Sequence, residues 1–260
     1  MTLQSSLTGM VDHLLPSEEP TPEQLKFGRA FVAPGPINAD VLAKWLEPER
    51  VAERDAKAAY GLATDWANLG RYRDANAKLA GRDVRTVFLG DSITEAWPFA
   101  DPDLFSNGVI GRGISGQTSQ QILLRLMPDA IALRPRSIHL MCGINDIAGN
   151  TGPTTPQDFK NTMSAMAVLI RNAGIELILG SITPAAGFPW KSDLPDPRPR
   201  IRDLNVWIKE LADTHGATYA DYHAVLKTSD DRLRPDLTRD GVHPQTPGYR
   251  LMRSIVEAAL

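Results

Sequence analysis

From about residue 83 to the end of the chain, short apolar runs alternate with longer amphipathic segments. Most of the apolar runs are rich in β-branched or aromatic residues and end near glycine, proline or aspartate, which predicts buried strands. The five predicted strands lie at residues 85–90, 107–111, 137–143, 175–184 and 217–221. Strands that alternate with helices in this way indicate a parallel sheet with helices on both faces, so the predicted fold class is α/β.

Three amphipathic segments between and after these strands predict helices. Apolar residues recur at helical spacing in residues 156–174, 199–216 and 246–260. Gly174 and Gly216 end the first two segments, and glycine is a typical helix stop.

The first 80 residues predict an N-terminal extension. Residues 1–37 are polar and contain several prolines, and the segment FVAPGPINAD indicates extended chain that ends at a helix start. From Ala39 to about Ala80, apolar and aromatic residues are spaced as in helices. We therefore expect a helical extension, residues 1–80, packed on a main domain of residues 81–260. A stabilising cover is its favoured role, and an active-site lid or a contact that forms a homo-oligomer remains open.

The composition bears on partners and location. The chain has 260 residues, 42% of them apolar and 23% charged, as is ordinary for a globular protein. Its net charge of −3 gives no electrostatic reason to expect nucleic acid or an anionic membrane as a partner. No apolar run approaches the roughly 18 residues that a membrane span needs. The first residues lack the basic start and apolar stretch of a signal peptide, so we expect a cytoplasmic protein. The alternative is a periplasmic or secreted protein whose signal peptide has been removed.

Chemically active residue types cluster in four loops. Three follow the first three strands, and the fourth precedes the last helix. The loops are Gly90-Asp91-Ser92, the glycine loop up to Gly116, Gly143-Ile144-Asn145-Asp146 and Asp240-Gly241-Val242-His243. In parallel sheets of this class ligands bind at the carboxyl ends of the strands. We therefore expect the four loops to converge on one rim of the sheet.

Together these residues can carry out acyl transfer. A serine hydroxyl is a poor nucleophile until a base takes its proton, and His243 can be that base for Ser92. Asp240, three residues earlier, can orient the imidazole and stabilise its charged form. The oxyanion of a tetrahedral intermediate needs hydrogen-bond donors. The backbone N–H groups of Ser92 and Gly116 and the side-chain amide of Asn145 can supply them.

The blocks FLGDSIT, GISGQT, GIND and DGVHP occur in this order along the chain. In order and approximate spacing they resemble the SGNH-hydrolase superfamily, also called the GDSL esterases and lipases. The resemblance extends from about Arg85 to Leu260. The segments GRGISGQTSQQ and GNTGP are similar to the branch with platelet-activating-factor-acetylhydrolase-like and carbohydrate acetyl esterases. Gly111 departs from that branch, in which asparagine often precedes Arg-Gly.

The resemblance implies a three-layer α/β/α sandwich with a flavodoxin-like five-stranded parallel sheet. It also implies Ser92 as the nucleophile, His243 as the base with Asp240 behind it, and an oxyanion hole made by Ser92, Gly116 and Asn145. The expected activity is cofactor-free hydrolysis of short acyl esters, acetyl first, of a carbohydrate or small alcohol through an acyl-enzyme. Lysophospholipase and thioesterase activities remain alternatives, as does a non-catalytic ligand-binding domain that keeps the fold.

Gly111, Gly113 and Gly116 also have the G-x-G-x-x-G spacing of a dinucleotide-binding loop. Such a loop should follow the first strand, whereas this one follows the second, and no acidic residue lies at a strand tip about 20 positions later. We therefore expect no nucleotide cofactor. The single cysteine, Cys142, and the scattered histidines provide no cluster at metal-ligand spacing, so we expect no metal either.

Four further residues are weaker candidates for contact with the substrate, and each is equally suited to packing. They are Trp97, Arg112, Phe188 and Trp190. We expect Asp91 and Asp146 to brace loops, and His139 to be buried within its apolar strand. Asp221 and His223 form a rival acid–base pair, but they lack the loop context of the pair near the C-terminus.

Overall fold

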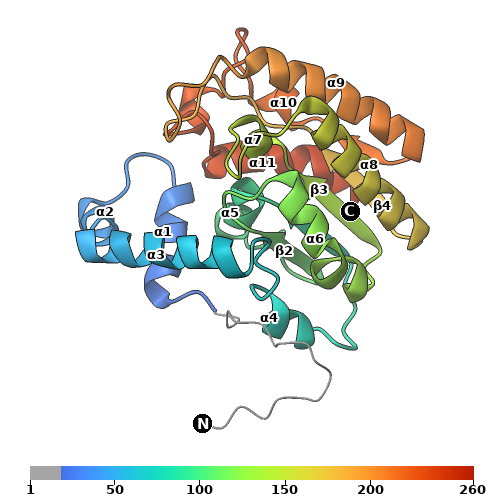
Figure 1. Cartoon of the computed structure of the whole chain (residues 1–260), viewed down its shortest axis with the longest axis horizontal. Helices are drawn as coiled ribbons and strands as arrows, with labels where there is room; N and C mark the ends of the chain where they lie inside the picture. Colours follow the sequence, from blue (N-terminus) through green and yellow to red (C-terminus); the bar gives the residue numbers. More distant parts are fainter. Residues whose placement is uncertain (1–18) are drawn as a thin grey trace.

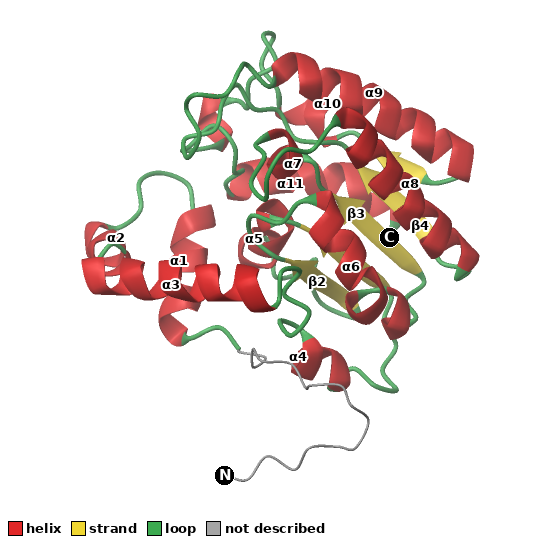
Figure 2. Cartoon of the chain, viewed as in Figure 1, coloured by secondary structure: helices red, strands yellow, loops and turns green. Residues whose placement is uncertain are grey.

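The computed structural model describes residues 19–260, and the part of the predicted extension before residue 19 lies outside the described residues. Five parallel strands form one sheet in the order β2-β1-β3-β4-β5. The strands are β1 (Thr86–Gly90), β2 (Val109–Gly113), β3 (Ser137–Met141), β4 (Glu176–Gly180) and β5 (Thr218–Ala220). Helices cover both faces of the sheet (Figure 2), which confirms the predicted α/β/α fold.

The central strands are buried from both sides. Every residue of β1 and β3 is buried. In β1, Val87 and Leu89 belong to the core cluster on one face, and Phe88 between them belongs to the cluster on the other. A strand that is covered on both faces has apolar residues at successive positions instead of at every second position. The continuous apolar runs in the sequence therefore predicted these strands.

The main domain contributes the helices of both outer layers. They are α5 (Ser92–Ala100), α6 (Ser119–Asp129), α7 (Ile144–Ile147), α8 (Pro156–Asn172), α9 (Arg198–His215), α10 (Tyr222–Leu226) and α11 (Thr246–Val256). Short 3-10 helices lie at Ile131–Leu133, Pro235–Leu237 and Glu257–Ala259. Helices α6, α8 and α9 supply one core cluster, whereas α5, α10 and α11 supply the other. No helix among residues 19–260 is long and apolar enough to cross a membrane.

The helix signals of the sequence mark the observed helix ends. Thr155 and Asp158 form a capping box at the start of α8, with Pro156 as the first helical residue. Helix α9 ends at Gly216, whose left-handed φ of 58° suits glycine better than any other residue.

The close approach of α5 to the sheet depends on Gly113, the last residue of β2. A Cβ atom at Gly113 would lie only 2.1 Å from the Glu95 backbone nitrogen. Gly113 also lies two residues beyond the predicted end of this strand at residue 111. The middle glycine of the G-x-G-x-x-G spacing serves packing between a strand and a helix here.

Four helices precede the sheet, and one of them corrects the sequence prediction. They are α1 (Pro22–Val32), α2 (Ala39–Trp45), α3 (Pro48–Thr64) and α4 (Arg73–Ala77). The extended segment predicted over FVAPGPINAD is wrong at Phe31 and Val32, which are the last two residues of α1. This helix begins with a capping box between Thr21 and Gln24. The signal T-P-E-Q was present in the sequence, but the prolines after the helix dominated the interpretation.

Helix α1 is part of the folded body, whereas α2 and α3 are peripheral. Val32 is 2% exposed and belongs to the same core cluster as Trp97 and Met252. At Gly28 a Cβ atom would lie 2.9 Å from the Phe99 ring, so α1 and α5 are in close contact. In contrast, α2 and α3 contain no buried residue and lie at the side of the molecule, away from the sheet (Figure 1).

Candidate active site

Ser92 and His243 meet at the carboxyl edge of the sheet. Ser92 follows β1 and is the first residue of α5, and His243 lies in the loop before α11. The Ser92 Oγ atom is 2.9 Å from His243 Nε2, and His243 Nδ1 is 2.7 Å from Asp240 Oδ2. Ser92 and His243 are both half-buried. The structure therefore joins in one chain of hydrogen bonds three residues that the sequence placed in two distant blocks.

The loop that contains Asp240 and His243 is shaped by its own hydrogen bonds. The Asp240 Oδ1 atom accepts from the backbone N–H groups of Val242 at 2.9 Å and His243 at 2.8 Å. The Thr238 hydroxyl donates to the His243 carbonyl at 2.9 Å. Gly241 adopts a left-handed φ of 80°, which closes the turn without the strain that a side chain would cause. The spacing D-G-V-H thus presents carboxylate and imidazole to each other.

This environment keeps the Asp240 carboxyl ionised. Burial acts to raise the pKa of Asp240, but hydrogen bonds from the His243 ring and from the N–H groups of His243 and Val242 bring that pKa below its ordinary value. A carboxylate at Nδ1 favours the imidazole tautomer that carries its proton on Nδ1. The Nε2 lone pair then faces the Ser92 hydroxyl, as a general base requires.

The two predicted oxyanion residues of the loops are linked by Asn150, which the sequence analysis did not single out. Its Nδ2 group donates to Asn145 Oδ1 at 2.7 Å and to the Gly116 carbonyl at 3.4 Å. Asn145 in turn donates to the Gln117 carbonyl at 3.0 Å, and its amide retains a second N–H. Asn150 lies within the segment GNTGP, so the signal was present, but only as a likeness to a family.

Trp190 connects these amides to the imidazole. Its Nε1–H donates to Asn150 Oδ1 at 3.1 Å, and its ring centroid lies 6.1 Å from that of His243. Gly116, with a left-handed φ of 78°, lies on the other side of Asn150. One continuous set of contacts therefore links the hydroxyl–imidazole pair, through Trp190 and Asn150, to Asn145 and Gly116.

Two buried aspartates brace the loops around the site. Asp91 caps α5 by accepting the Ile93 N–H at 3.1 Å, and burial raises its pKa to about 7. Asp146 accepts from the Ser119 N–H at 3.0 Å and from the Ser119 hydroxyl at 2.5 Å. Burial also raises the pKa of Asp146. The hydrogen bonds of Asp146 join the loop after β3 to the start of α6.

Arg125 on α6 holds the strand ends in place, and sequence reasoning missed it. Its guanidinium donates to the carbonyls of Gly90 at 2.6 Å and Arg112 at 2.7 Å. It also donates to Gln117 Oε1 at 2.5 Å and pairs with Asp129 at 3.2 Å. Arg125 is fully buried, and these acceptors compensate for the loss of water. Arg125 lies on the buried face of α6 together with Gln121 and Asp129, and the sequence pattern did not predict a helix over these residues.

The four weaker candidates occupy different places. Trp190 lies beside His243 and is 43% exposed. Phe188 is buried, and its ring centroid lies 5.5 Å from that of Trp190. Trp97 is fully buried and packs on Phe88, so it presents no surface to a substrate. Arg112 is also buried.

Several contacts fix the Arg112 guanidinium in the body of the protein. It lies 4.8 Å from the Tyr72 ring centroid and donates to Asn76 at 2.8 Å. The structure therefore places only Trp190 of the four at the surface of the site.

The rival pair serves the start of α10. Asp221 caps that helix by accepting the Ala224 N–H at 3.1 Å. The backbone N–H of His223 donates to the Ser181 hydroxyl at 2.9 Å, and burial lowers the pKa of the His223 ring. Both residues therefore stabilise the start of α10 at the end of the sheet.

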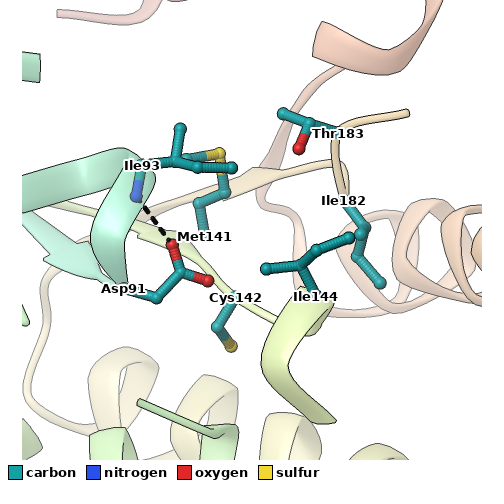
Figure 3. Close-up of a pocket in the computed structure, with 7 residues that line it drawn as sticks. All are labelled: Asp91, Ile93, Met141, Cys142, Ile144, Ile182 and Thr183. Carbon is teal, nitrogen blue, oxygen red and sulfur yellow. Dashed lines mark hydrogen bonds between the residues drawn. The ribbon is translucent and has the colours of Figure 1, made fainter. Parts of the chain in front are cut away.

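A small cavity of about 10 Å³ lies next to the segment that carries Ser92, and Figure 3 shows the residues that line it. Its lining consists of Asp91, Ile93, Met141, Cys142, Ile144, Ile182 and Thr183. Asp91 and Ile93 are the chain neighbours of Ser92, and the other lining residues lie at the end of β3 or just after β3 and β4. A volume of this size holds about one water molecule. Within residues 19–260, no group of three or more histidine, cysteine or acidic residues is arranged to hold a metal ion.

A five-stranded parallel sheet with a serine, a histidine and an aspartate at its carboxyl edge is the arrangement of the SGNH class of α/β/α hydrolases. The model of the GDSL-like lipase/acylhydrolase family matches residues 88–251 of this chain. The chain therefore belongs to that family and is a hydrolase of the GDSL type. Helices α1 to α4 lie outside the matched residues.

Solved structures show the same fold. A GDSL-like lipase from Bacteroides thetaiotaomicron is 39% identical, over 75% of this chain and 98% of that one, with a TM-score of 0.72. A second structure, a putative acylhydrolase from Bacteroides fragilis, is 40% identical over 75% and 96% of the two chains, also with a TM-score of 0.72. An acetylxylan esterase from Geobacillus stearothermophilus shares the fold at 22% identity, 67% and 93% coverage, and a TM-score of 0.56. Among curated proteins, no relative matches this chain.

Proposed function

We propose that this hydrolase is a serine esterase that removes short acyl groups, acetyl first, from a carbohydrate or a small alcohol. The observation that carries the proposal is the hydrogen-bonded row of Ser92, His243 and Asp240, with separations of 2.9 Å and 2.7 Å. A hydroxyl, an imidazole base and a carboxylate in this order form the constellation of nucleophilic acyl transfer.

In the first half of the reaction, Ser92 Oγ attacks the ester carbonyl and His243 Nε2 takes the hydroxyl proton. The imidazolium formed in this way is stabilised by the Asp240 carboxylate. It then gives the proton to the departing alcohol, and the acyl group remains on Ser92. In the second half, His243 activates a water molecule, which releases the acid and regenerates the hydroxyl.

The negative charge of each tetrahedral intermediate requires fixed donors. Ser92 is the first residue of α5, so its N–H has no acceptor within the helix and is free to bind an anion. The Gly116 N–H and the second N–H of the Asn145 amide are the other donors in this proposal. Such donors stabilise the transition state more than the ground state because they are held in place before the charge develops.

Two features support a short acyl group and a compact alcohol. The cavity next to the Ser92 segment is small, about 10 Å³, which favours a short acyl group over a long one. The exposed face of Trp190 beside His243 suits the apolar face of a sugar ring. One structural neighbour is an acetylxylan esterase, and we extend that class of substrate, acetylated carbohydrate, to this chain as part of the proposal.

Labelling with a fluorophosphonate probe and cleavage of p-nitrophenyl acetate test the catalytic role. Wild-type protein should take the label and cleave the ester, and Ser92→Ala should do neither. Ser254→Ala removes an exposed hydroxyl on α11 and should behave as wild type. Intact wild-type protein that neither takes the label nor cleaves an ester would favour the non-catalytic binding domain instead.

A panel of p-nitrophenyl esters from acetyl to palmitoyl tests the acyl length. We expect kcat/KM to be highest for acetyl and to fall as the chain lengthens, because the cavity beside Ser92 is small. A maximum at long chains would support a lysophospholipase, and a strong preference for acyl thioesters over the matching oxygen esters would support a thioesterase.

A further inference from the structure

The C-terminal end of α1 is attached to the loop that carries Asp240 and His243. The last carbonyl groups of a helix have no partner within it and must be satisfied elsewhere. Here the donors come from residues on either side of the acid–base pair. Gln245 donates to the Ala33 carbonyl at 2.8 Å, and Thr246 donates to the Val32 carbonyl at 3.0 Å.

Arg239, directly before Asp240, completes this attachment. Its guanidinium donates to several carbonyl groups at the end of α1, which form a single acceptor cluster. The acceptors are the carbonyls of Ala30, Phe31, Ala33 and Gly35. A cation at the C-terminal end of a helix is also favoured by the helix dipole. The position of α1 is thus coupled to the loop that presents the catalytic imidazole.

This attachment places an aromatic ring of the extension against the site. Phe31, one residue before the end of α1, packs edge-on against the His243 imidazole with ring centroids 5.4 Å apart. Behind it, Phe27 lies 6.0 Å from Phe31 and stacks on Trp45 at 3.9 Å. Trp190 is a second aromatic neighbour of the imidazole, with centroids 6.1 Å apart.

The chemistry of the proposed reaction shows which part of the substrate these rings face. The leaving oxygen must lie within hydrogen-bond distance of His243 Nε2 when it receives the proton. The acyl oxygen instead faces the donors at Ser92, Gly116 and Asn145. Aromatic rings against the imidazole therefore lie next to the alcohol part of the ester.

We propose that Phe31 is a specificity-determining residue and that α1 completes the alcohol subsite. Phe31 and Trp190 form two walls of this subsite, which accepts alcohols with a broad apolar face, such as a pyranose or an aryl ring. Arg239 is a positioning residue that holds Phe31 against His243. The inference rests on the proposed esterase function, but it assigns a binding role to a helix outside the residues that match the family.

Selectivity among alcohols, at a constant acyl group, tests the role of Phe31. The substrates are p-nitrophenyl acetate, an acetylated methyl xyloside and ethyl acetate. We expect Phe31→Ala to lower kcat/KM for the two ring alcohols, relative to ethyl acetate, by about tenfold, the usual effect of a lost apolar contact. The ratio of kcat/KM for p-nitrophenyl acetate and butyrate should not change, because the acyl group lies elsewhere.

Control variants separate a local effect from a global one. Phe31→Leu keeps apolar volume against the core cluster around Val32 and should shift the selectivity in the same direction but by less. Tyr60→Ala removes an aromatic side chain, 51% exposed, from α3 and should leave every ratio unchanged. Equal losses on all esters, or an unchanged alcohol ratio in both Phe31 variants, would overturn the subsite.

The same ratios test Arg239. If Arg239 acts by holding Phe31, Arg239→Ala should shift alcohol selectivity as Phe31→Ala does, and the double variant should shift it no further. A uniform loss on all esters in Arg239→Ala would show that Arg239 supports the His243 loop instead, and would overturn its assignment. Wild-type protein that cleaves no ester would overturn the esterase function itself, whereas an active enzyme with unaltered selectivity in the Phe31 variants overturns only the subsite.

Discussion

In each of two histidines of this protein, Nε2 shares a hydrogen bond with a side-chain hydroxyl, but the surroundings of the two rings differ. His243 Nε2 is 2.9 Å from Ser92 Oγ at the rim of the sheet. His139 Nε2 is 2.8 Å from the Tyr222 hydroxyl inside the core, where the His139 ring stacks on Phe88 with centroids 4.4 Å apart. A hydroxyl–imidazole pair is therefore not by itself an active site.

The second ring nitrogen makes the difference. His243 Nδ1 faces the Asp240 carboxylate at 2.7 Å, whereas His139 Nδ1 has no hydrogen-bond partner among the described residues. Burial lowers the pKa of His139 to about 3, so that ring stays neutral at ordinary pH. Of these two histidines, His243 is the one with a negative charge placed to stabilise an imidazolium. The Asp240 carboxylate therefore allows the His243 imidazole to act as a proton acceptor, a role for which His139 has no such support.

The largest expected effect tests the two pairs directly. Ser92→Ala and His243→Ala should each lower kcat for p-nitrophenyl acetate by about 10⁶-fold, and the double variant should lose little more, because the members act as a unit. Tyr222→Phe removes the hydroxyl of the other pair and should leave kcat within about twofold of wild type, since it touches no reacting atom. Losses that add in the double variant would contradict the assigned roles.

Replacement of the carboxylate should make the rim pair behave like the buried one. Asp240→Asn keeps the oxygen that accepts from Val242 and His243, but it presents an N–H to His243 Nδ1. The imidazole then carries its proton on Nε2 and cannot accept from Ser92, so we expect kcat/KM to fall by about 10⁴-fold. A thermal melt should stay near that of wild type. A fall of only a few fold would show that orientation by the carboxylate is dispensable.

His139 should affect the free energy of unfolding and not the rate of ester hydrolysis. Its pKa lies below the value in the unfolded chain, about 3 against 6.5, so its contribution to stability is present above pH 6.5. That contribution is lost as the pH falls from 6.5 toward 3 because the unfolded chain binds the proton first. The total is at most about 5 kcal/mol.

Urea unfolding of wild type and His139→Gln at several pH values measures this contribution. Glutamine does not titrate, so the wild-type free energy of unfolding should fall relative to the variant as the pH is lowered below 6.5. Parallel curves for the two proteins would show that His139 titrates normally in the folded state.

The smallest expected effect concerns Asn150, which orients the predicted oxyanion residues without reaching the reacting atoms. Asn150→Ala should lower kcat about tenfold with little change in KM, less than the loss of a direct donor. Trp190→Phe keeps a smaller aromatic ring beside His243 but removes the indole bond to Asn150, and with p-nitrophenyl acetate it should lower kcat by less. A change in KM alone would assign Asn150 to ground-state binding.

The predictable parts of the molecule are those whose signals are local. The buried strands β1 and β3 are apolar runs in the sequence. The start of helix α8 is marked by the N-cap Thr155 and by Pro156. The D-G-V-H block likewise fixes its own loop, because Asp240 binds the N–H groups two and three residues later. Such features need few distant contacts, so the sequence pattern is sufficient to find them.

Other features depend on contacts between remote segments. The Arg125 guanidinium needs carbonyls from two strand ends as well as the side chains of Gln117 and Asp129. Asn150 is placed by its bonds to Asn145 and Gly116. Trp97, an attractive pocket candidate by its position after β1, is instead buried in the core. The periodicity of apolar residues predicts strands and helices, but it does not predict which distant residues a long side chain will contact.

The sequence by itself determined the parallel α/β fold and the four loops from which a candidate site is built, because strand burial and turn chemistry are local. The tertiary structure decided that Phe31 lies against His243, since that contact requires the end of α1 to be held by Arg239, Gln245 and Thr246, more than 200 positions along the chain. It also decided that this imidazole meets the Ser92 hydroxyl, because the two residues lie 151 positions apart and the rim of the sheet that joins them exists only after the chain has folded.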